Sequence, residues 1–483
     1  MTQSVKINYI LNLINTGSQM IFPLITFPYA CRILEADGIG KVNFFTSIIG
    51  YISLLTCLGI PMYAIREIAK DRNNVIRMNQ TTVEILLLHT ILTLIGYIIV
   101  AILCISIPQI KADLSLFLVL SLTIFFTAIG CEWFYQGIED FKYITIRGLI
   151  IKSIAIILLF LLVRTKDDLI YYGWYTVIGI LGGNIFNFFR LRKYIHRKNI
   201  IFTDLNIIKH LKPAIQVFSL NVVISIYIQL NPVLLGFIEG TLAVGFFTAA
   251  TKVMMMITRL SSCLGAVVMP RVSHLLAENK EVEFKSLIQK SYDFTIAIAL
   301  PLTIWMIFSA PYIIHILCGT EFYPSVLTSQ IIAPVILLVG ISNVMGIQVL
   351  YPKGRIQVVI RCCLIGAITD LVLSLILIPF LSYNGVAIAY LCAEISTTLS
   401  MYIIAKKDLP ITYWRKNHFL YLLGALVMAI TILLTAKYIN ASTIIIFIIQ
   451  GVVGFMSYFL FLLFMKEEFM QYLISRLKGN ICK

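Results

Sequence analysis

Charged residues are scarce in this sequence of 483 residues: Asp, Glu, Lys and Arg together make up only 13%, whereas hydrophobic residues make up 59%. This scarcity excludes an ordinary soluble enzyme, because soluble domains carry about twice that share of charged residues. The apolar residues occur in stretches of about 20, the length at which a helix crosses the hydrocarbon core of a bilayer. We count fourteen such stretches and predict an all-α integral membrane protein with about 14 transmembrane helices.

Acidic residues are fewer than basic ones, with 23 against 38, and the formal net charge is +15. Such a surplus can indicate nucleic-acid binding. Here, however, most of the Lys and Arg residues lie in every second gap between the apolar stretches, which is the pattern that marks cytoplasmic loops. The distribution therefore predicts that these charges meet the head groups of the lipid bilayer and bind no nucleic acid. It also predicts that both termini lie in the cytoplasm.

The sequence also lacks the motifs of common enzymes and metal sites. It has 10 cysteines but no CxxC pair, and its six histidines are not spaced for zinc. No glycine-rich nucleotide-binding loop is convincing. The predicted outer gaps are too short to hold the carboxylates of a glycan polymerase or glycosyltransferase. We therefore expect neither an enzyme nor a bound metal or cofactor. Any energy that the protein needs would come from an ion gradient or from consumption of a product.

A weak internal repeat is visible. A shift of 204 residues pairs Pro28 with Pro232 and Glu35 with Glu239. The shift covers six apolar stretches, an even number, so both copies would run in the same direction through the membrane. The repeat predicts two parallel six-helix lobes, at 1–205 and 206–405, followed by a helix pair and a cytoplasmic tail at 406–483.

Polar side chains follow one face of the first apolar stretch. Asn12, Asn15 and Gln19 are three and four residues apart, so they share one side of a helix. Exposure of these three polar side chains to lipid would cost free energy. It is expected to face the interior of the bundle, either to form hydrogen bonds between helices or to line a water-filled cavity for the substrate.

Five cations lie within the apolar stretches. Lys252 lies near the middle of 241–269, and Arg259 follows two turns later on the same side. A cation at the bilayer centre costs about 2.5–3.5 kcal/mol on insertion scales, so this position favours a functional role. Arg147, Lys152 and Arg361 lie nearer the cytoplasmic ends, where a long side chain can also extend to the interface. All five are candidate substrate-binding residues, and a cavity with this charge suits an anionic head group.

Two carboxylates lie deep in later stretches. Asp370 is near the middle of 356–379, and Glu394 is near the middle of 385–405. Each could pair with a cation such as Lys252, or each could be protonated as part of an H⁺ or Na⁺ relay. Both are candidate ion-coupling residues, and the sequence leaves the two alternatives open.

Several motifs, taken in their order along the chain, resemble the bacterial O-antigen and capsular polysaccharide flippases. This family shares a superfamily with the multidrug/toxic-compound antiporters and the lipid II flippases, and the resemblance covers nearly the full chain. The matching motifs are Arg32–Gly40 with Asn43 and Phe44, Gly59 and Ile60 with Ile65–Ala69, Val244–Lys252 leading to Met269–Ser273, and Ile378 and Pro379 with Asn384–Ala387.

The resemblance implies a MATE/MOP-like fold of two lobes around a cationic cavity. By alternating access, such a protein would move undecaprenyl-diphosphate-linked oligosaccharide repeat units across the bacterial inner membrane for O-antigen or capsule synthesis, with a polysaccharide polymerase as a candidate partner. In the related lipid II flippases, basic residues of the first, second and eighth helices contact the diphosphate. Here the eighth stretch supplies Lys252 and Arg259, whereas the first has no cation between Lys6 and Arg32.

The alternative prediction is an ion-coupled multidrug antiporter of the same fold. Such a protein would be expected to hold acidic groups in the cavity of its first lobe, where they would bind cations. That lobe has Glu84 and Glu132, both near the predicted inner ends of their stretches. The flippase is therefore the first prediction and the antiporter the second.

Overall fold

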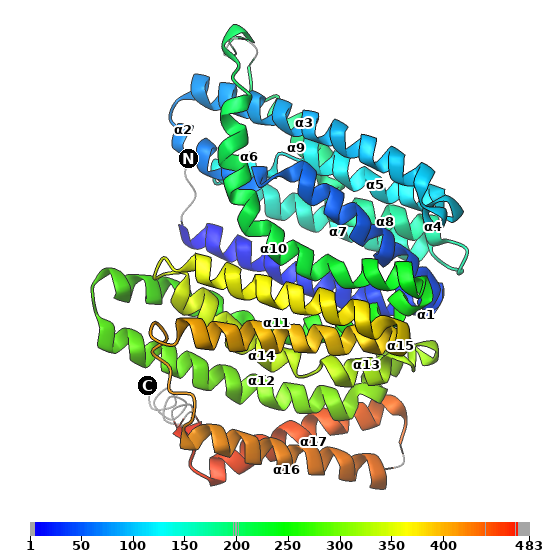
Figure 1. The fold of residues 1–483 in the computed structure, drawn as a ribbon, viewed down its shortest axis with the longest axis vertical. Coiled ribbons are helices and arrows are strands. Elements are labelled where there is room, and N and C mark those ends of the chain that lie inside the picture. The colour runs from blue at the N-terminus through cyan, green and yellow to red at the C-terminus, as the bar shows by residue number, and fades with distance from the viewer. Residues whose placement is uncertain are drawn as a thin grey trace. The chain divides into compact units, whose positions relative to one another are not determined.

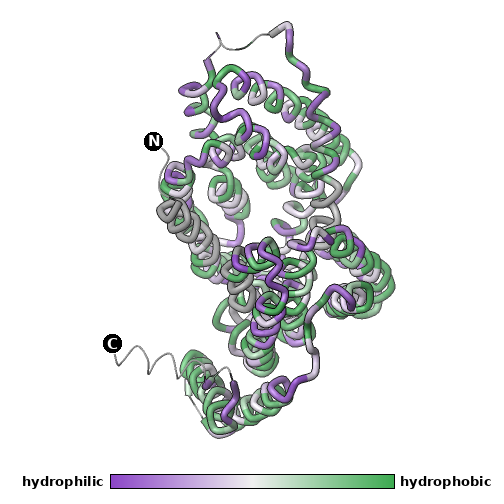
Figure 2. Tube along the Cα trace, turned by 90° about the vertical axis from the view of Figure 1, so that its left-hand side faces the viewer, coloured by the Kyte–Doolittle hydropathy of each residue, from purple (hydrophilic) through white to green (hydrophobic). Residues whose placement is uncertain are grey.

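The computed structural model describes residues 5–196, 198, 200, 202–439, 441–468 and 470–471, with side chains for all of these except 5–16, 19–20, 202, 219–228, 260–267 and 270. Within these ranges every regular element is a helix (Figure 1), and hydrophobic residues predominate along most of the helices (Figure 2). Ten of the described helices are long and apolar enough to cross a membrane, or eleven if the bent pair α8 and α9 forms one span. The all-α, multi-pass prediction is confirmed, whereas the number fourteen stays a prediction.

The chain divides into two compact units, Met1–Gly236 and Phe237–Lys483. The boundary falls near the end of α10, and the predicted lobes at 1–205, 206–405 and 406–483 stay a prediction. The helices of the first unit are α1 (Val5–Cys57), α2 (Ile60–Asp71), α3 (Val75–Ser106), α4 (Pro108–Ala112), α5 (Leu114–Ile129), α6 (Glu132–Gly137), α7 (Phe141–Leu162), α8 (Leu169–Leu181), α9 (Gly183–Leu191), the 3₁₀ turn η2 (Phe202–Asp204) and α10 (Ile208–Ile238).

The second unit is also helical throughout its described residues. Its elements are α11 (Thr241–Ala277), α12 (Glu281–Cys318), the 3₁₀ turn η3 (Thr320–Phe322), α13 (Ser325–Ile332), α14 (Val335–Asn343), the π-helical turn η4 (Val344–Leu350), α15 (Ile356–Ala405), α16 (Lys416–Tyr438) and α17 (Thr443–Phe464). Within this unit α12 packs against α11, α16 and α17.

Two long elements are each broken at a single non-glycine residue. In α1 the break is at Glu35, with φ 61°, and in α15 it is at Ser382, with φ 49°. Positive φ values are costly for residues with a side chain. The internal repeat pairs Glu35 with Glu239, and the chain breaks there too, because α10 ends at Ile238 and Gly240 has φ 89°. The two halves therefore end their first helix at the paired position.

In the first unit, α1 packs against α5 and α7, and α9 closes the end of α5. Asn184 Nδ2 donates to Phe126 O at 2.9 Å, and Asn187 Nδ2 donates to Gly130 O at 2.6 Å. Carbonyl groups at a helix end have no partner within the helix and need donors from elsewhere. The two asparagines therefore fix α9 to the end of α5, and α9 also contacts α7, the helix that carries two of the candidate cations.

Candidate functional site

Lys152 connects α7 to α1 within the first unit. Its Nζ donates a hydrogen bond to Ser18 Oγ at 2.9 Å and lies 5.8 Å from the ring centroid of Phe22. Ser18 and Phe22 are one turn apart on α1, so a hydroxyl group and an aromatic face meet the same cation. Although α1 has no Lys or Arg between Lys6 and Arg32, α7 supplies it with a positive charge.

Arg147, five residues before Lys152 on α7, is held in an ion pair. Its Nη2 lies 2.9 Å from Glu132 Oε2, and its Nη1 is 3.5 Å from Gly183 O. Only 11% of the Arg147 side chain is exposed. Both Arg147 and Glu132 lie within electrostatic range of Lys152. The structure thus gathers two predicted cations and one carboxylate into a polar cluster that keeps a net positive charge.

Local backbone features allow this cluster to form. Cys131, with φ 44°, separates α5 from α6 and places Glu132 at the start of α6. At Gly183, a Cβ atom would lie 2.8 Å from Arg147 Nε, closer than normal packing permits. A residue without a side chain at position 183 is therefore needed for the guanidinium group to approach α9.

Two further candidate cations, Lys252 and Arg259, lie on α11 in the second unit. They are seven residues apart, so both point to one side of the helix. Both side chains are exposed, although they belong to a segment, Thr241–Arg259, that is apolar enough to span a membrane. Exposed cations on a spanning helix are costly against lipid, so this side of α11 is suited to water or to an anionic ligand.

Asp370 and Glu394 lie on opposite arms of α15. The break at Ser382 divides α15 into two arms, and these arms pack against each other where Gly366 faces Ala393 and Thr397. Asp370 is fully buried, and Glu394 is 6% exposed. Tyr390 lies within electrostatic range of both carboxylates. The two predicted ion-coupling residues are therefore both buried, and each lies within electrostatic range of the same tyrosine.

The close approach of the α15 arms gives a stability prediction for Gly366→Val. A Cβ atom at this position would collide with Thr397 Oγ1 and lie 3.0 Å from Ala393 O, which is backbone and cannot rotate away. We expect the variant to lose about 1–3 kcal/mol of stability, the usual cost of overpacking. Thermal unfolding of the purified protein in detergent would measure it.

Gly451→Val on α17 is the matched control, because the nearest atom to a Cβ there is Trp305 Nε1, at 4.0 Å. Both substitutions place a β-branched residue in an apolar helix, and only Gly366→Val requires its neighbours to move. An equal fall in melting temperature for the two variants would contradict close packing of the arms.

The remaining predicted residues are not part of these clusters. Arg361 is exposed, one turn into α15. Asn12, Asn15 and Gln19 belong to α1, but their side chains lie outside the described residues, so the predicted polar stripe stays a prediction.

One polar network of the first unit was not predicted from the sequence. Glu84, fully buried on α3, accepts hydrogen bonds from His210 Nε2 at 2.9 Å and from the Asn206 backbone N–H at 2.8 Å. Tyr63 OH lies 2.7 Å from His210 Nδ1. Burial lowers the pKa of His210 despite the opposing effect of Glu84, so the ring is neutral at pH 7 and accepts from Tyr63. Glu84 therefore fixes the start of α10 to α2 and α3.

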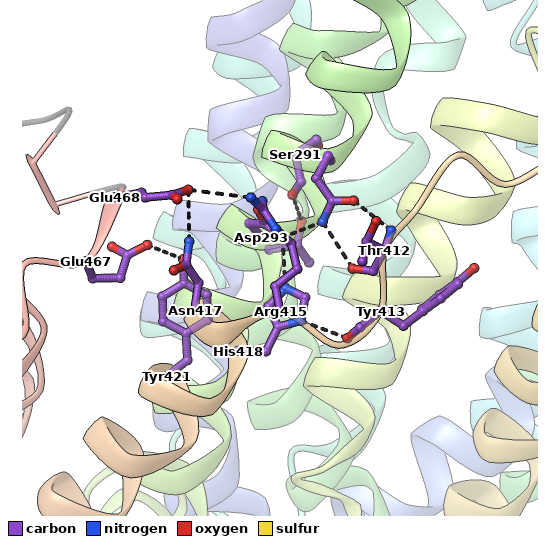
Figure 3. A network of polar contacts seen from close by, with 12 residues as sticks. Ser291, Asp293, Thr412, Tyr413, Arg415, Asn417, His418, Tyr421, Glu467 and Glu468 are labelled. Atoms are coloured by element: carbon purple, nitrogen blue, oxygen red, sulfur yellow. Dashed lines mark hydrogen bonds and ion pairs between the residues drawn. The ribbon is translucent and has the colours of Figure 1, made fainter. Parts of the chain in front are cut away.

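A second unpredicted network joins α12 to α16 in the second unit (Figure 3). Asp293 accepts hydrogen bonds from Arg415 Nη1 at 2.6 Å, His418 Nε2 at 2.8 Å and Gln289 Nε2 at 2.7 Å. Gln289 also holds the backbone of Thr412, just before α16. This network anchors the C-terminal helix pair to α12.

Comparison with known proteins gives a consistent picture. Residues 5–276 match a family described as "Polysaccharide biosynthesis protein". A curated relative from Shigella dysenteriae, described as an O-antigen transporter, is 28% identical over 407 residues, which cover 82% of this chain and 98% of the relative. Another, from Escherichia coli and described in the same way, is 24% identical over 408 residues, which cover 84% of this chain and 97% of the relative.

Solved structures share the fold. An inward closed structure of the lipid II flippase MurJ has a TM-score of 0.73 at 17% identity, covering 96% of this chain and all of that one. An inward-facing multidrug resistance transporter of the MATE family, from the MOP superfamily, has a TM-score of 0.64 at 12% identity, covering 83% of this chain and 98% of that one. These similarities confirm the predicted MATE/MOP-like fold.

Proposed function

Because this chain belongs to the family of polysaccharide biosynthesis proteins, we propose that it is a flippase for lipid-linked oligosaccharide repeat units. Its two curated relatives are described as O-antigen transporters, and it spans nearly their whole length. The observation that carries the proposal is the pair of exposed cations, Lys252 and Arg259, on one side of the membrane-spanning part of α11. Membrane-embedded cations with a common orientation suit a substrate that brings its own negative charge into the bilayer.

The chemistry of such a substrate explains the residue types. An undecaprenyl diphosphate group is anionic and accepts charge-assisted hydrogen bonds, which Lys and Arg donate. In the proposal Lys252 and Arg259 bind the diphosphate, and Lys152, held by Ser18, is a further substrate-binding cation. Arg147 keeps Glu132 in place near Lys152. The oligosaccharide requires a polar lining, for which Asn12, Asn15 and Gln19 are candidates, and the lipid tail stays in the membrane.

An ion gradient can supply the energy for net transport, and the two buried carboxylates of α15 are the candidate coupling residues. In the proposal Asp370 and Glu394 take up H⁺ or Na⁺, because burial disfavours the bare negative charge of a carboxylate. The protein lies in the bacterial inner membrane with both termini in the cytoplasm, as the distribution of Lys and Arg indicates. It delivers repeat units for O-antigen or capsule, and a polysaccharide polymerase would consume them on the other side.

The multidrug antiporter remains the second candidate, favoured by the likeness to the MATE transporter structure. A cationic drug would need a carboxylate to bind. In the first unit, Glu132 is neutralised by Arg147 at 2.9 Å and has Lys152 nearby. The net positive charge of this cluster opposes cation binding, so the flippase is the better supported function.

Lys152→Met tests the contribution of the first unit. Methionine preserves most of the side-chain volume but removes the charge, so we expect the rate of glycan export to fall about tenfold, the effect of losing one charge-assisted hydrogen bond. Lys152→Arg should keep most of the rate. Lys166→Met, an exposed lysine in the loop between α7 and α8, is the matched control. Wild-type export by Lys152→Met would remove this residue from the proposal.

Deleting the gene in its own bacterium tests the proposal as a whole, because the cognate repeat unit is then present. The proposal predicts loss of surface polysaccharide, accumulation of lipid-linked repeat units on the cytoplasmic side, and recovery with a plasmid copy. Normal polysaccharide together with new sensitivity to cationic drugs would support the antiporter instead.

A further inference from the structure

A groove of about 470 Å³ runs along α7 beside α9, and of its lining residues the proposed transport uses only Arg147, which holds Glu132. Its apolar wall includes Ile146, Ile150 and Ile154, whose spacing of four residues makes a stripe about 12 Å long on one helix face. These side chains are 46%, 53% and 44% exposed. Phe186 of α9, 56% exposed, faces the same groove. The groove wall that these side chains form is exposed and apolar, which suits a hydrocarbon chain.

The other end of the groove is cationic. Lys142, Arg147 and Arg190 line it, together with the carboxylate Asp140. The ring of Tyr143 lies near both guanidinium groups, with its centroid 3.7 Å from the central carbon of Arg190 and 5.7 Å from that of Arg147. The contact with Tyr143 and the ion pairs of the two arginines restrict both groups at the groove, so less side-chain entropy is lost when they bind an anion.

The charge of this end indicates what it binds. Asp140 pairs with Arg190 at 2.7 Å, and Glu132 pairs with Arg147 at 2.9 Å, so two of the three cations are balanced. One positive charge remains, and Lys142 is exposed. A phosphodiester carries one negative charge. Each guanidinium group has five N–H donors, so both retain donors beyond those used by their carboxylates.

We propose that this groove on α7 and α9 is a binding site for an anionic phospholipid of the membrane. Lys142, Arg147 and Arg190 hold its phosphate, and an acyl chain lies along Ile146, Ile150 and Ile154. The phosphate end is at the N-terminal end of α7, which the charge distribution predicts to be cytoplasmic, where basic pockets between helices meet anionic head groups. A zwitterionic lipid binds more weakly, because its ammonium group meets the surplus positive charge. Arg147 is the one residue that the lipid site shares with the proposed transport, where it holds Glu132.

Lipid retention by the purified full-length protein tests the proposal. The protein is reconstituted in nanodiscs of equal phosphatidylglycerol and phosphatidylethanolamine, extracted in mild detergent, and the lipids that remain bound are quantified by mass spectrometry. We expect phosphatidylglycerol to exceed phosphatidylethanolamine about fivefold, the factor for one cation facing one anionic head group. Equal retention of the two lipids would overturn the proposal.

Two variants locate the bound lipid. Ile150→Trp fills the groove and leaves every charge in place, whereas Lys142→Glu reverses the unbalanced charge, and each should bring phosphatidylglycerol down to the level of phosphatidylethanolamine. Ile157→Trp is the matched control, because Ile157 is 58% exposed on the same helix but outside the groove. Equal loss with Ile157→Trp and Ile150→Trp would contradict the site. Displacement of phosphatidylglycerol by added undecaprenyl diphosphate would also overturn it and assign the groove to the transported lipid.

Discussion

Replacing both Lys252 and Arg259 with alanine is expected to stop glycan export while the protein remains folded in the membrane. The two side chains are exposed on one side of α11, so their truncation to alanine opens no cavity in the core. Each cation donates charge-assisted hydrogen bonds to the diphosphate in our proposal, and losing one such bond lowers a rate about 10- to 100-fold. Surface polysaccharide and the cytoplasmic pool of lipid-linked repeat units measure the effect.

Charge-preserving variants separate binding from packing. Lys252→Arg and Arg259→Lys should each retain a large part of the export rate. Arg271→Ala is the matched control, because Arg271 is exposed on the same helix but lies beyond its apolar segment, Thr241–Arg259. Normal export by the double alanine variant, or an equal loss in Arg271→Ala, would refute the role of the α11 cations.

Asp293→Ala should produce the largest loss of stability. Its carboxylate accepts hydrogen bonds from Arg415, His418 and Gln289, and only 11% of its side chain is exposed (Figure 3). Without the Asp293 carboxylate, the guanidinium group of Arg415 and the imidazole ring of His418, which can be protonated, lie near each other next to α12. We expect a loss of about 2–3 kcal/mol, a value below that of a fully buried pair because Arg415 is partly exposed.

Thermal unfolding in detergent measures this loss, and Asp293→Asn should recover part of it, because the amide oxygen still accepts a hydrogen bond. Glu281→Ala, at the start of the same helix, removes an exposed pair with Lys285 and is expected to change stability little. If Asp293→Ala and Glu281→Ala melt at the same temperature, the network does not anchor the C-terminal helices.

Much of the architecture could be predicted from the sequence, because a spanning helix must be apolar over its whole length. The internal repeat was informative as well. It paired Glu35 with Glu239, and both halves end their first helix at that point. The break at Ser382 falls in the gap predicted between 356–379 and 385–405. The number of spans is harder to confirm, since α1 and α15 each continue through a break at one residue, Glu35 or Ser382.

The candidate site could be predicted only in part. Depth in the membrane singled out Lys252, Asp370 and Glu394, and Lys152 was a candidate whose side chain can also extend to the interface. Their neighbours could not be predicted, because Lys152 meets Ser18 across 134 positions of sequence. The sequence placed Glu132 near the end of its stretch but named no partner for it, whereas the structure pairs it with Arg147 and leaves 40% of its side chain exposed. Contacts of this kind depend on helix packing, for which one sequence carries no local signal.

The most direct test of the central claim is flipping by the purified protein in proteoliposomes. The repeat unit of the source bacterium, linked to undecaprenyl diphosphate and labelled on its sugar, is placed in both leaflets, and a membrane-impermeant reagent reports the fraction in the outer leaflet. The account predicts protein-dependent exchange between leaflets for the wild type and none for the Lys252→Ala, Arg259→Ala double variant. Absence of exchange by the folded wild-type protein, with or without a proton or sodium gradient, would contradict it.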